Sequence, residues 1–124
     1  MKAFSDLEQS KKLAEILPLE SADMYWWSSG KRYYIEAMDD GDFNEEEGHI
    51  RAWSLAALIN IIPQELFDGE YIINITEGID NKWIITYDHY ENRNHSYYGL
   101  SFSADNLVDA CYDMILKLHE LKML

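Results

Sequence analysis

Residues 71–102 read YIINITEGIDNKWIITYDHYENRNHSYYGLSF and decide the fold. Large apolar side chains alternate with polar ones in three runs, which is typical of strands that bury one face. Loops of four or five residues, around residues 78–81 and 91–94, separate the runs and favour antiparallel hairpins. The sequence therefore predicts a three-stranded antiparallel meander. Its apolar face consists of Tyr71, Ile73, Ile75, Trp83, Ile85, Tyr87, Tyr98, Leu100 and Phe102.

The second loop of this meander predicts how its last two strands pair. A slip by one residue would turn the apolar residues of one strand to the other face, so the pattern selects one register. The predicted pairs are Tyr87–Tyr98, Ile85–Leu100 and Trp83–Phe102. Ile85 is then expected inside and Thr86 outside, so that aspartate should unfold the domain at position 85 and be tolerated at position 86.

A helix should follow the meander directly. Ser103 is a good N-terminal cap, and Asp105 lies in the first turn, where the helix dipole favours an acid. Basic residues near the end of the helix suit the opposite end of the dipole. The apolar stripe, expected to cover the sheet, consists of Leu107, Cys111, Met114, Ile115, Leu118 and Leu121. The basic residues are Lys117, His119 and Lys122.

Residues 6–17 predict an N-terminal helix. Ser5 and Glu8 have the spacing of a capping box, and Pro18 ends the helix, because the residue before a proline avoids helical geometry. The apolar stripe of this helix consists of Leu7, Leu13, Ala14, Ile16 and Leu17.

Residues 53–62 predict a second helix. Ser54 is its expected cap and Pro63 follows its end. The segment is apolar on nearly every side, so we expect it to be buried in the centre of the domain.

Two aromatic runs, residues 24–27 and 31–35, surround a Ser/Gly turn and predict an N-terminal hairpin. Neighbouring residues of a strand point to opposite faces, so one member of each adjacent aromatic pair should face outward. The aromatic residues are Trp26, Trp27, Tyr33 and Tyr34. An acidic, hydrated loop is expected over residues 39–48, with the carboxylates of Asp39, Asp40, Asp42, Glu45, Glu46 and Glu47. These ten residues are the candidate partner-binding site, because exposed Trp and Tyr beside acids suit either a protein interface or a sugar platform.

These elements predict one α+β domain over residues 1–124. The meander packs against the C-terminal helix, the second helix is the buried central one, and the first lies outside. The N-terminal hairpin is a candidate extension of the meander.

Composition and charge limit the classes of function. The chain has 124 residues, of which 48% are hydrophobic and 14% aromatic, too many for a disordered protein. A formal net charge of −13 repels nucleic acids and anionic membranes, so no direct binding to either is expected. The longest apolar run is too short to span a bilayer, and the start does not read as a signal peptide. A cytoplasmic protein is therefore expected, and Cys111, the only cysteine, has no partner for an internal disulfide.

Metal and cofactor motifs fail on inspection. Residues 40–44 begin like a calcium loop, but Glu45 replaces the glycine of the turn and Arg51 stands where the bidentate acid belongs. His119 begins like a zinc-protease helix, but Met123 occupies the place of the second histidine. No metal and no cofactor is predicted.

Only one acid–base cluster can be assembled from the sequence. His89 and His95 flank the second hairpin loop near Asp88 and Glu91. A hairpin end is solvated and lacks the enclosed pocket that effective catalysis needs. Cys111 lies on an apolar helix stripe, as a core residue would, so the sequence offers an enzyme no positive support.

Several segments are similar to a known group of proteins. Residues 20–26 (ESADMYW), 52–58 (AWSLAAL), 62–63 (IP) and 109–115 (DACYDMI) resemble small uncharacterised proteins of gut anaerobic bacteria, often carried on prophages and other mobile elements. The resemblance implies a helix–strand–helix layout and a bacterial or phage origin. It implies no catalytic residue, ligand or activity.

The sequence thus favours a non-catalytic domain that binds another protein, with self-association as the nearest variant. One alternative is an acidic inhibitor of a nucleic-acid-handling enzyme, in which carboxylates imitate phosphates. A hydrolase using His89 or His95 is the other alternative.

Overall fold

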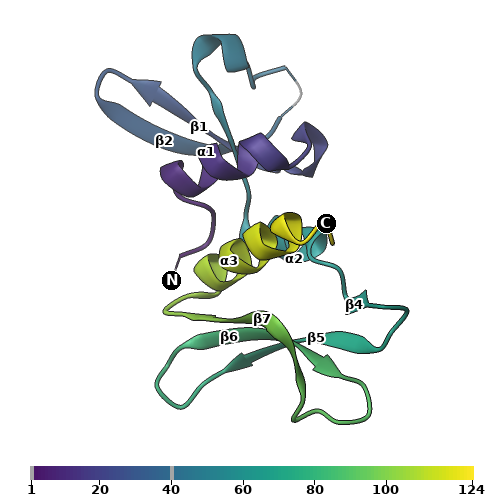
Figure 1. Cartoon of the computed structure of the whole chain (residues 1–124). Coiled ribbons are helices and arrows are strands. Elements are labelled where there is room, and N and C mark those ends of the chain that lie inside the picture. The colour runs from purple at the N-terminus through teal and green to yellow at the C-terminus, as the bar shows by residue number, and fades with distance from the viewer. Residues whose placement is uncertain (1, 40) are drawn as a thin grey trace. The chain divides into compact units, whose positions relative to one another are not determined.

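The computed structural model describes residues 2–39 and 41–124, which form an α+β structure (Figure 1). Three α-helices and two antiparallel sheets, of three and four strands, make up the described part of the chain. Contacts group the chain into two compact units, Ala3–Leu58 and Ile59–Leu124, the latter together with Lys2. We call these the N-terminal and C-terminal units. Two units can still unfold as one, so the single domain stays a prediction.

The C-terminal unit contains the expected meander, extended by one short strand. The strand order in this sheet is β4-β5-β6-β7. The strands are β4 (Glu65–Leu66), β5 (Tyr71–Glu77), β6 (Trp83–His89) and β7 (Ser96–Ala104), followed by α3 (Leu107–Glu120). Figure 1 shows α3 lying along this sheet, where it contacts β6 and β7. The alternation of the sequence therefore predicted the sheet correctly.

Helix α3 buries its predicted stripe but begins later than expected. β7 continues to Ala104, so Ser103 is a strand residue and not the cap. Asn106 is the cap instead, and its side chain accepts a hydrogen bond from the backbone N–H of Asp109. Leu121 lies beyond the last turn and is 39% exposed. The rest of the stripe, from Leu107 to Leu118, is buried.

The predicted register between β6 and β7 is wrong by two residues. Ile85 lies opposite Phe102, and Trp83 lies opposite Ala104. A shift by two keeps each residue on its face, so Leu100 is still fully buried. The pairing changes again between Thr86 and Asp88, where β7 carries a bulge that includes Gly99, with φ +82°.

Two exposure predictions in this sheet fail. Tyr98, expected inside, lies in the bulged part of β7 and is 96% exposed. Thr86, expected outside, is buried, as are its neighbours Ile85, Tyr87 and Asp88. Because β6 is a central strand that is covered on both faces at these positions, alternation could not identify a solvent face.

The N-terminal hairpin forms its own sheet and does not extend the meander. The strand order is β2-β1-β3, and the strands are β1 (Met24–Ser29), β2 (Arg32–Ala37) and β3 (Ile50–Ala52). A two-residue turn with Gly30 at φ +65° joins β1 to β2, as expected of a tight hairpin. β3 pairs with the other side of β1 and so leaves β2 at the edge.

Helix α1 (Leu7–Ile16) lies against β3 and is fixed at both ends by side chains. Its capping box uses Asp6 and Gln9, not the predicted Ser5 and Glu8, because Asp6 has the same spacing one residue later. At the other end, the guanidinium of Arg51 donates to the carbonyl oxygens of Ala14 (3.1 Å) and Leu17 (3.2 Å). Arg51 thereby satisfies carbonyls that a helix end leaves without partners.

Ser5 is fully buried and connects three parts of the N-terminal unit. Its Oγ accepts from the backbone N–H of Trp53 at 3.0 Å and lies 2.7 Å from the Oγ of Ser10 in α1. Its carbonyl oxygen accepts from the indole Nε1 of Trp26 at 3.2 Å. A serine too early to cap the helix therefore links α1, β1 and the segment after β3.

Helix α2 (Leu55–Ile61) is not the buried central helix that its composition predicted. Ser54 does cap it, by accepting from the N–H of Ala57. Only Leu58 is buried within its span, and Ile59 is 38% exposed. Apolar residues all around a helix permit burial on any side, but they do not impose it.

Candidate functional site

The two faces of the β1–β2 hairpin differ in how they use their aromatic side chains. Trp27 lies opposite Tyr34 on one face, together with Tyr25. Trp26 lies opposite Ile35 on the other face. Adjacent residues of β1 thus point to opposite sides, as expected for a strand.

Trp27 and Tyr34 form a partly exposed aromatic pair. Their rings stack with centroids 4.8 Å apart and an interplanar angle of 28°. Tyr34 is 41% exposed, and Tyr33, on the other face, is 48% exposed. The indole Nε1 of Trp27 is buried and has no hydrogen-bond partner within the described residues. A buried N–H without an acceptor is uncommon and needs a structural or functional explanation.

Trp26, also in the predicted site, has a role inside the unit. Its Nε1 donates to Ser5, and its ring meets Phe4 edge to face at 5.7 Å. Both the N–H and the ring of Trp26 therefore have partners within the N-terminal unit.

The acidic loop folds back onto Tyr25. His49 stacks on the Tyr25 ring at 5.1 Å, and Phe43 meets that ring edge to face at 5.7 Å. The Nδ1 of His49 accepts from the N–H of Asn44 at 3.0 Å, so the neutral ring carries its proton on Nε2. The loop is therefore held by rings and hydrogen bonds.

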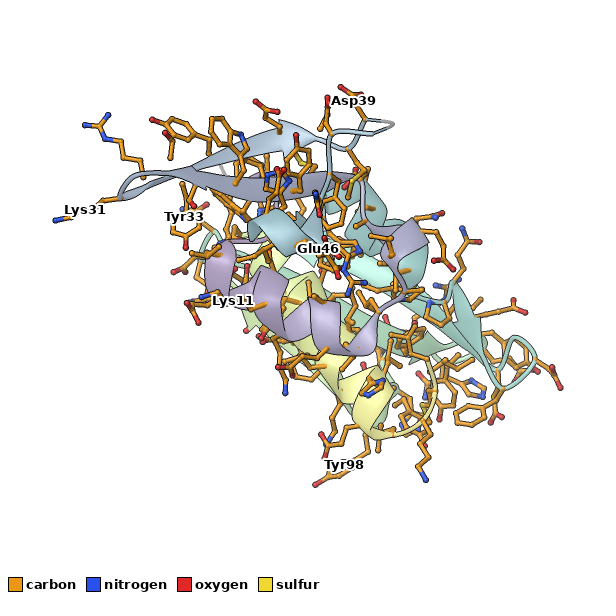
Figure 2. The ribbon with its side chains drawn as sticks, turned by 90° about the horizontal axis from the view of Figure 1, so that it is seen from above. Lys11, Lys31, Tyr33, Asp39, Glu46 and Tyr98 are labelled. Carbon is orange, nitrogen blue, oxygen red and sulfur yellow. The ribbon has the colours of Figure 1, made fainter. Side chains whose placement is uncertain are left out.

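The acids of this loop fall into two groups. Glu45 pairs with Arg51 at 3.2 Å, and Glu47 lies 3.8 Å from His49. Glu45 and Glu47 belong to the short 3₁₀ turn η2 (Glu45–Glu47). Asp39, Asp42 and Glu46 are exposed and make no ion pair with another described residue. Figure 2 labels Asp39 and Glu46. Asp40 lies outside the described residues.

Three carboxylates gather near the hydroxyl of Tyr25. That hydroxyl donates to Oε2 of Glu36 at 3.0 Å. Burial, the hydrogen bond to Glu36, and the charges of Glu36, Asp42 and Asp39 all raise the pKa of Tyr25. We call Trp27, Tyr34, Glu36, Asp39 and Asp42 the aromatic–acidic face.

Sequence reasoning missed the residues that hold this face together. His49 and Arg51 alternate with the apolar Ile50, as residues of a strand would. A run of three residues is too short for this alternation to be recognised in the sequence. Arg51 was considered only as a residue that spoils a calcium loop. The available signal was its position: Arg51 is the first Lys or Arg after the seven acids of residues 36–47, and so a candidate to pair with one of them.

The His89–His95 cluster does form, but without a catalytic geometry. The two rings lie 6.3 Å apart, as the hairpin predicted. The Nδ1 of His89 accepts from the backbone N–H groups of Glu91 and Asn92, and its Nε2 lies 3.9 Å from Glu70. His95 is exposed.

Asp88 and Glu91 are the two predicted acid partners of these histidines, and Asp88 stabilises the sheet instead. It is 5% exposed and accepts from Asn74 (2.9 Å) and Ser96 (2.8 Å). Because Asp88 and His89 are adjacent in β6, their side chains point to opposite faces. The histidine cluster therefore lacks Asp88. The carboxylate of Glu91 accepts from the hydroxyl of Tyr90 at 2.8 Å.

Other candidate residues lie where the patterns placed them. Cys111 is fully buried in α3, and burial raises the pKa of its thiol to about 12, so it is a core residue as predicted. His119 is exposed in the last turn of α3. No three His, Cys, Asp or Glu side chains among residues 2–39 and 41–124 are grouped to hold a metal ion. Over the same residues, no helix has the length and apolarity to cross a membrane.

Comparisons with protein families, with curated proteins and with solved structures returned no match. The similarity to small proteins of gut anaerobes and their prophages stays a prediction. The functional argument therefore rests on the geometry of this chain.

Proposed function

We propose that this chain is a small, non-catalytic protein-binding domain that binds a basic partner through its aromatic–acidic face. The carrying observation is the Trp27–Tyr34 stack, in which Tyr34 is 41% exposed. It lies on the same sheet face as Tyr25, the ring on which the charges of Glu36, Asp39 and Asp42 act. Trp and Tyr are the side chains most often found at the energetic centre of protein interfaces. Free carboxylates around them suit Arg and Lys, whose cations also bind aromatic faces.

The unpartnered indole of Trp27 supports this assignment. A buried donor without an acceptor costs roughly 1–3 kcal/mol, and such costs are often retained at functional sites. A carbonyl or carboxylate oxygen of a bound partner would supply the missing acceptor after a small movement of the ring. The partner would then recover a hydrogen bond that the free domain lacks.

The two alternatives have weaker support. A phosphate mimic needs many free acids on a rigid surface, but Glu45 and Glu47 are engaged by Arg51 and His49. A hydrolase at His89 and His95 would lack Asp88, and His95 is exposed. Each of these two hypotheses explains fewer of the observed contacts than the protein-binding hypothesis does.

Affinity capture from bacterial lysate with matched variants tests the proposal. Tyr34→Ala should abolish enrichment of specific proteins, whereas Tyr98→Ala, which removes a still more exposed ring of the C-terminal unit, should not. Asp42→Lys should weaken capture, whereas Glu77→Lys, with the same change of charge, should have little effect. Enrichment should fall as salt rises, because a basic partner is attracted through screened charges.

Two results would refute the binding face. The first is that all four variants enrich the same proteins as wild type. The second is that no protein is enriched over beads at low salt. Circular dichroism and thermal melts of each variant distinguish lost binding from lost fold.

A further inference from the structure

The outer edge of β2 is an unpaired strand edge of the N-terminal sheet. β2 ends its sheet, because the strand order is β2-β1-β3. An edge strand presents N–H and C=O groups without ladder partners, and natural proteins usually blunt such edges with proline, lysine or bulges. β2 has no proline, pairs with β1 without a bulge, and contains no buried residue. By contrast, the edge strand β7 is interrupted by its bulge at Gly99.

We propose that β2 pairs antiparallel with β2 of a second copy, so that two three-stranded sheets join around a two-fold axis. The inference starts from the backbone edge and shares Tyr34 and Glu36 with the aromatic–acidic face. It requires no foreign partner, so it does not rest on the proposed function. A two-fold interface must be self-complementary, since each copy contributes the same surface. The sequence of β2 meets this condition.

Strand geometry limits the register of such a pair. Residues that face each other across the two-fold axis have numbers with a constant sum. Outward-pointing backbone groups occur on every second residue, so that sum must be even. A sum of 68 centres the pair within β2. It places Tyr34 opposite Tyr34, Arg32 opposite Glu36, and Tyr33 opposite Ile35.

Charge selects this register over its neighbours. Arg32 and Glu36 are both exposed, and Arg32 makes no ion pair within the described residues. Glu36 uses Oε2 to accept from Tyr25, which leaves Oε1 for a partner. Sums of 66 or 70 would place Arg32 opposite Tyr34 or Met38, so neither forms an ion pair between two residues of β2. A sum of 70 brings only Lys31 and Asp39 together, beyond the ends of the strand. The sum of 68 forms the Arg32–Glu36 pair twice, once on each side of the axis.

The two faces of the joined sheet also match. Tyr34 meets its symmetry mate on the face that carries Trp27, which would extend the aromatic stack across the axis. On the other face, Tyr33 meets Ile35, an aromatic–β-branched pair of the kind that stabilises sheets. Figure 2 shows Lys31 at the hairpin tip and Tyr33 beside it, both standing clear of the sheet.

The association should be weak and reversible. Five paired residues from each copy bury less than the roughly 1,600 Å² of a standard interface. Two copies of net charge −13 also repel each other. We therefore expect a monomer of 14.6 kDa when dilute and a rising mass, approaching twice that value, as concentration increases.

Charge exchange between Arg32 and Glu36 tests both the dimer and its register by sedimentation. Arg32→Glu alone places Glu opposite Glu, and Glu36→Arg alone places Arg opposite Arg, so each should weaken self-association by about tenfold. An equimolar mixture of the two variants restores both attractive pairs and should associate as well as wild type. Arg93→Glu, with the same charge change on an exposed loop of the C-terminal unit, should leave association unchanged.

A second variant keeps the test valid if loss of the Tyr25–Glu36 hydrogen bond unfolds Glu36→Arg. Tyr33→Lys leaves that bond in place and should also weaken self-association, because an edge lysine opposes strand pairing. The proposal is overturned if wild type stays monomeric up to about 1 mM, the weak end of specific association. It is equally overturned if the variants associate like wild type, or if the mixture of folded variants stays monomeric. If wild type is monomeric but Arg32→Glu weakens capture of a foreign protein, the edge belongs to that protein.

Discussion

β6 of the C-terminal sheet has four consecutive buried residues, whereas β2 of the N-terminal sheet has none. Both strands are rich in aromatic and β-branched residues, WIITYDH and RYYIEA, so local propensity does not separate them. The difference comes from position: β6 has a neighbour on each side and is contacted by α3, and β2 is an edge. The same residue types therefore stabilise the fold in one sheet and form the exposed surface in the other.

The largest effect should come from charging the buried strand. Ile85→Asp introduces a carboxylate at a fully buried position and should cost at least about 4 kcal/mol, enough to unfold much of the protein. Thr76→Asp, an exposed change on the adjacent strand β5, should alter stability by no more than about 0.5 kcal/mol. Urea unfolding measures both, and equal midpoints would show that the buried strand is misassigned.

Thr86→Asp also separates the structure from the alternation pattern. The pattern predicted that aspartate would be tolerated there, but Thr86 is 9% exposed and Asp88 lies on the same face two residues away. A second carboxylate beside a buried one should be destabilising by several kcal/mol, though less than Ile85→Asp. A urea midpoint like that of wild type would show that Thr86 faces solvent, as the alternation pattern predicted.

The next effect concerns the N-terminal unit. Ser5→Ala removes the acceptor of the Trp53 N–H and the partner of Ser10, and it should cost about 1–3 kcal/mol. Ser28→Ala is the matched control, because Ser28 is exposed in β1 and should tolerate the change. If thermal melts gave the two variants the same midpoint, Ser5 would not connect this unit as described.

Two tryptophan substitutions compare the faces of the hairpin. Trp26→Phe loses the hydrogen bond to Ser5 and should cost about 1 kcal/mol more than Trp27→Phe, whose lost N–H has no described partner. Chemical denaturation of the two variants gives the difference directly. A larger loss for Trp27→Phe would mean that its indole nitrogen has a partner in the free protein.

The smallest effect lies on α3 and depends on pH. Burial and the charge of Asp109 raise the pKa of Asp113 above its ordinary value of 3.8. Ionisation of Asp113 therefore opposes folding: this cost is absent below pH 3.8 and fully present above the raised value. Asp113→Asn should stabilise slightly at pH 7 and lose that advantage at pH 3. A gain that is the same at both pH values would show that charge is not its cause.

The sequence predicted those elements whose signals are local. Alternation in residues 71–102 predicted the meander. Pro18 predicted the end of α1, and the Ser/Gly turn after Trp27 predicted the hairpin. Asp6 replaced Ser5 as the cap of α1 because two adjacent residues fit the same capping rule. The register of β7 failed because one bulge around Gly99 shifts the later pairs. A glycine inside a strand can mark a bulge, but it does not give the size of the shift.

The candidate site was predictable only in part. The opposite orientations of Trp26 and Trp27 followed from strand geometry, but which one the unit uses depended on Phe4 and Ser5, more than twenty residues away. The acidic loop is held by His49 and Arg51, which are placed by the pairing of β3 with β1. Long-range contacts of this kind leave no period in the sequence.

The lone cysteine in α3 gives this protein a built-in kinetic probe. A thiol reagent can reach Cys111 only when the C-terminal unit opens, so its rate of modification measures the frequency of that opening. Introducing Ser5→Ala, a change in the other unit, and following the same rate would show whether the two units open together. Acceleration in proportion to the lost stability would identify one cooperative domain, and an unchanged rate would identify two independent ones.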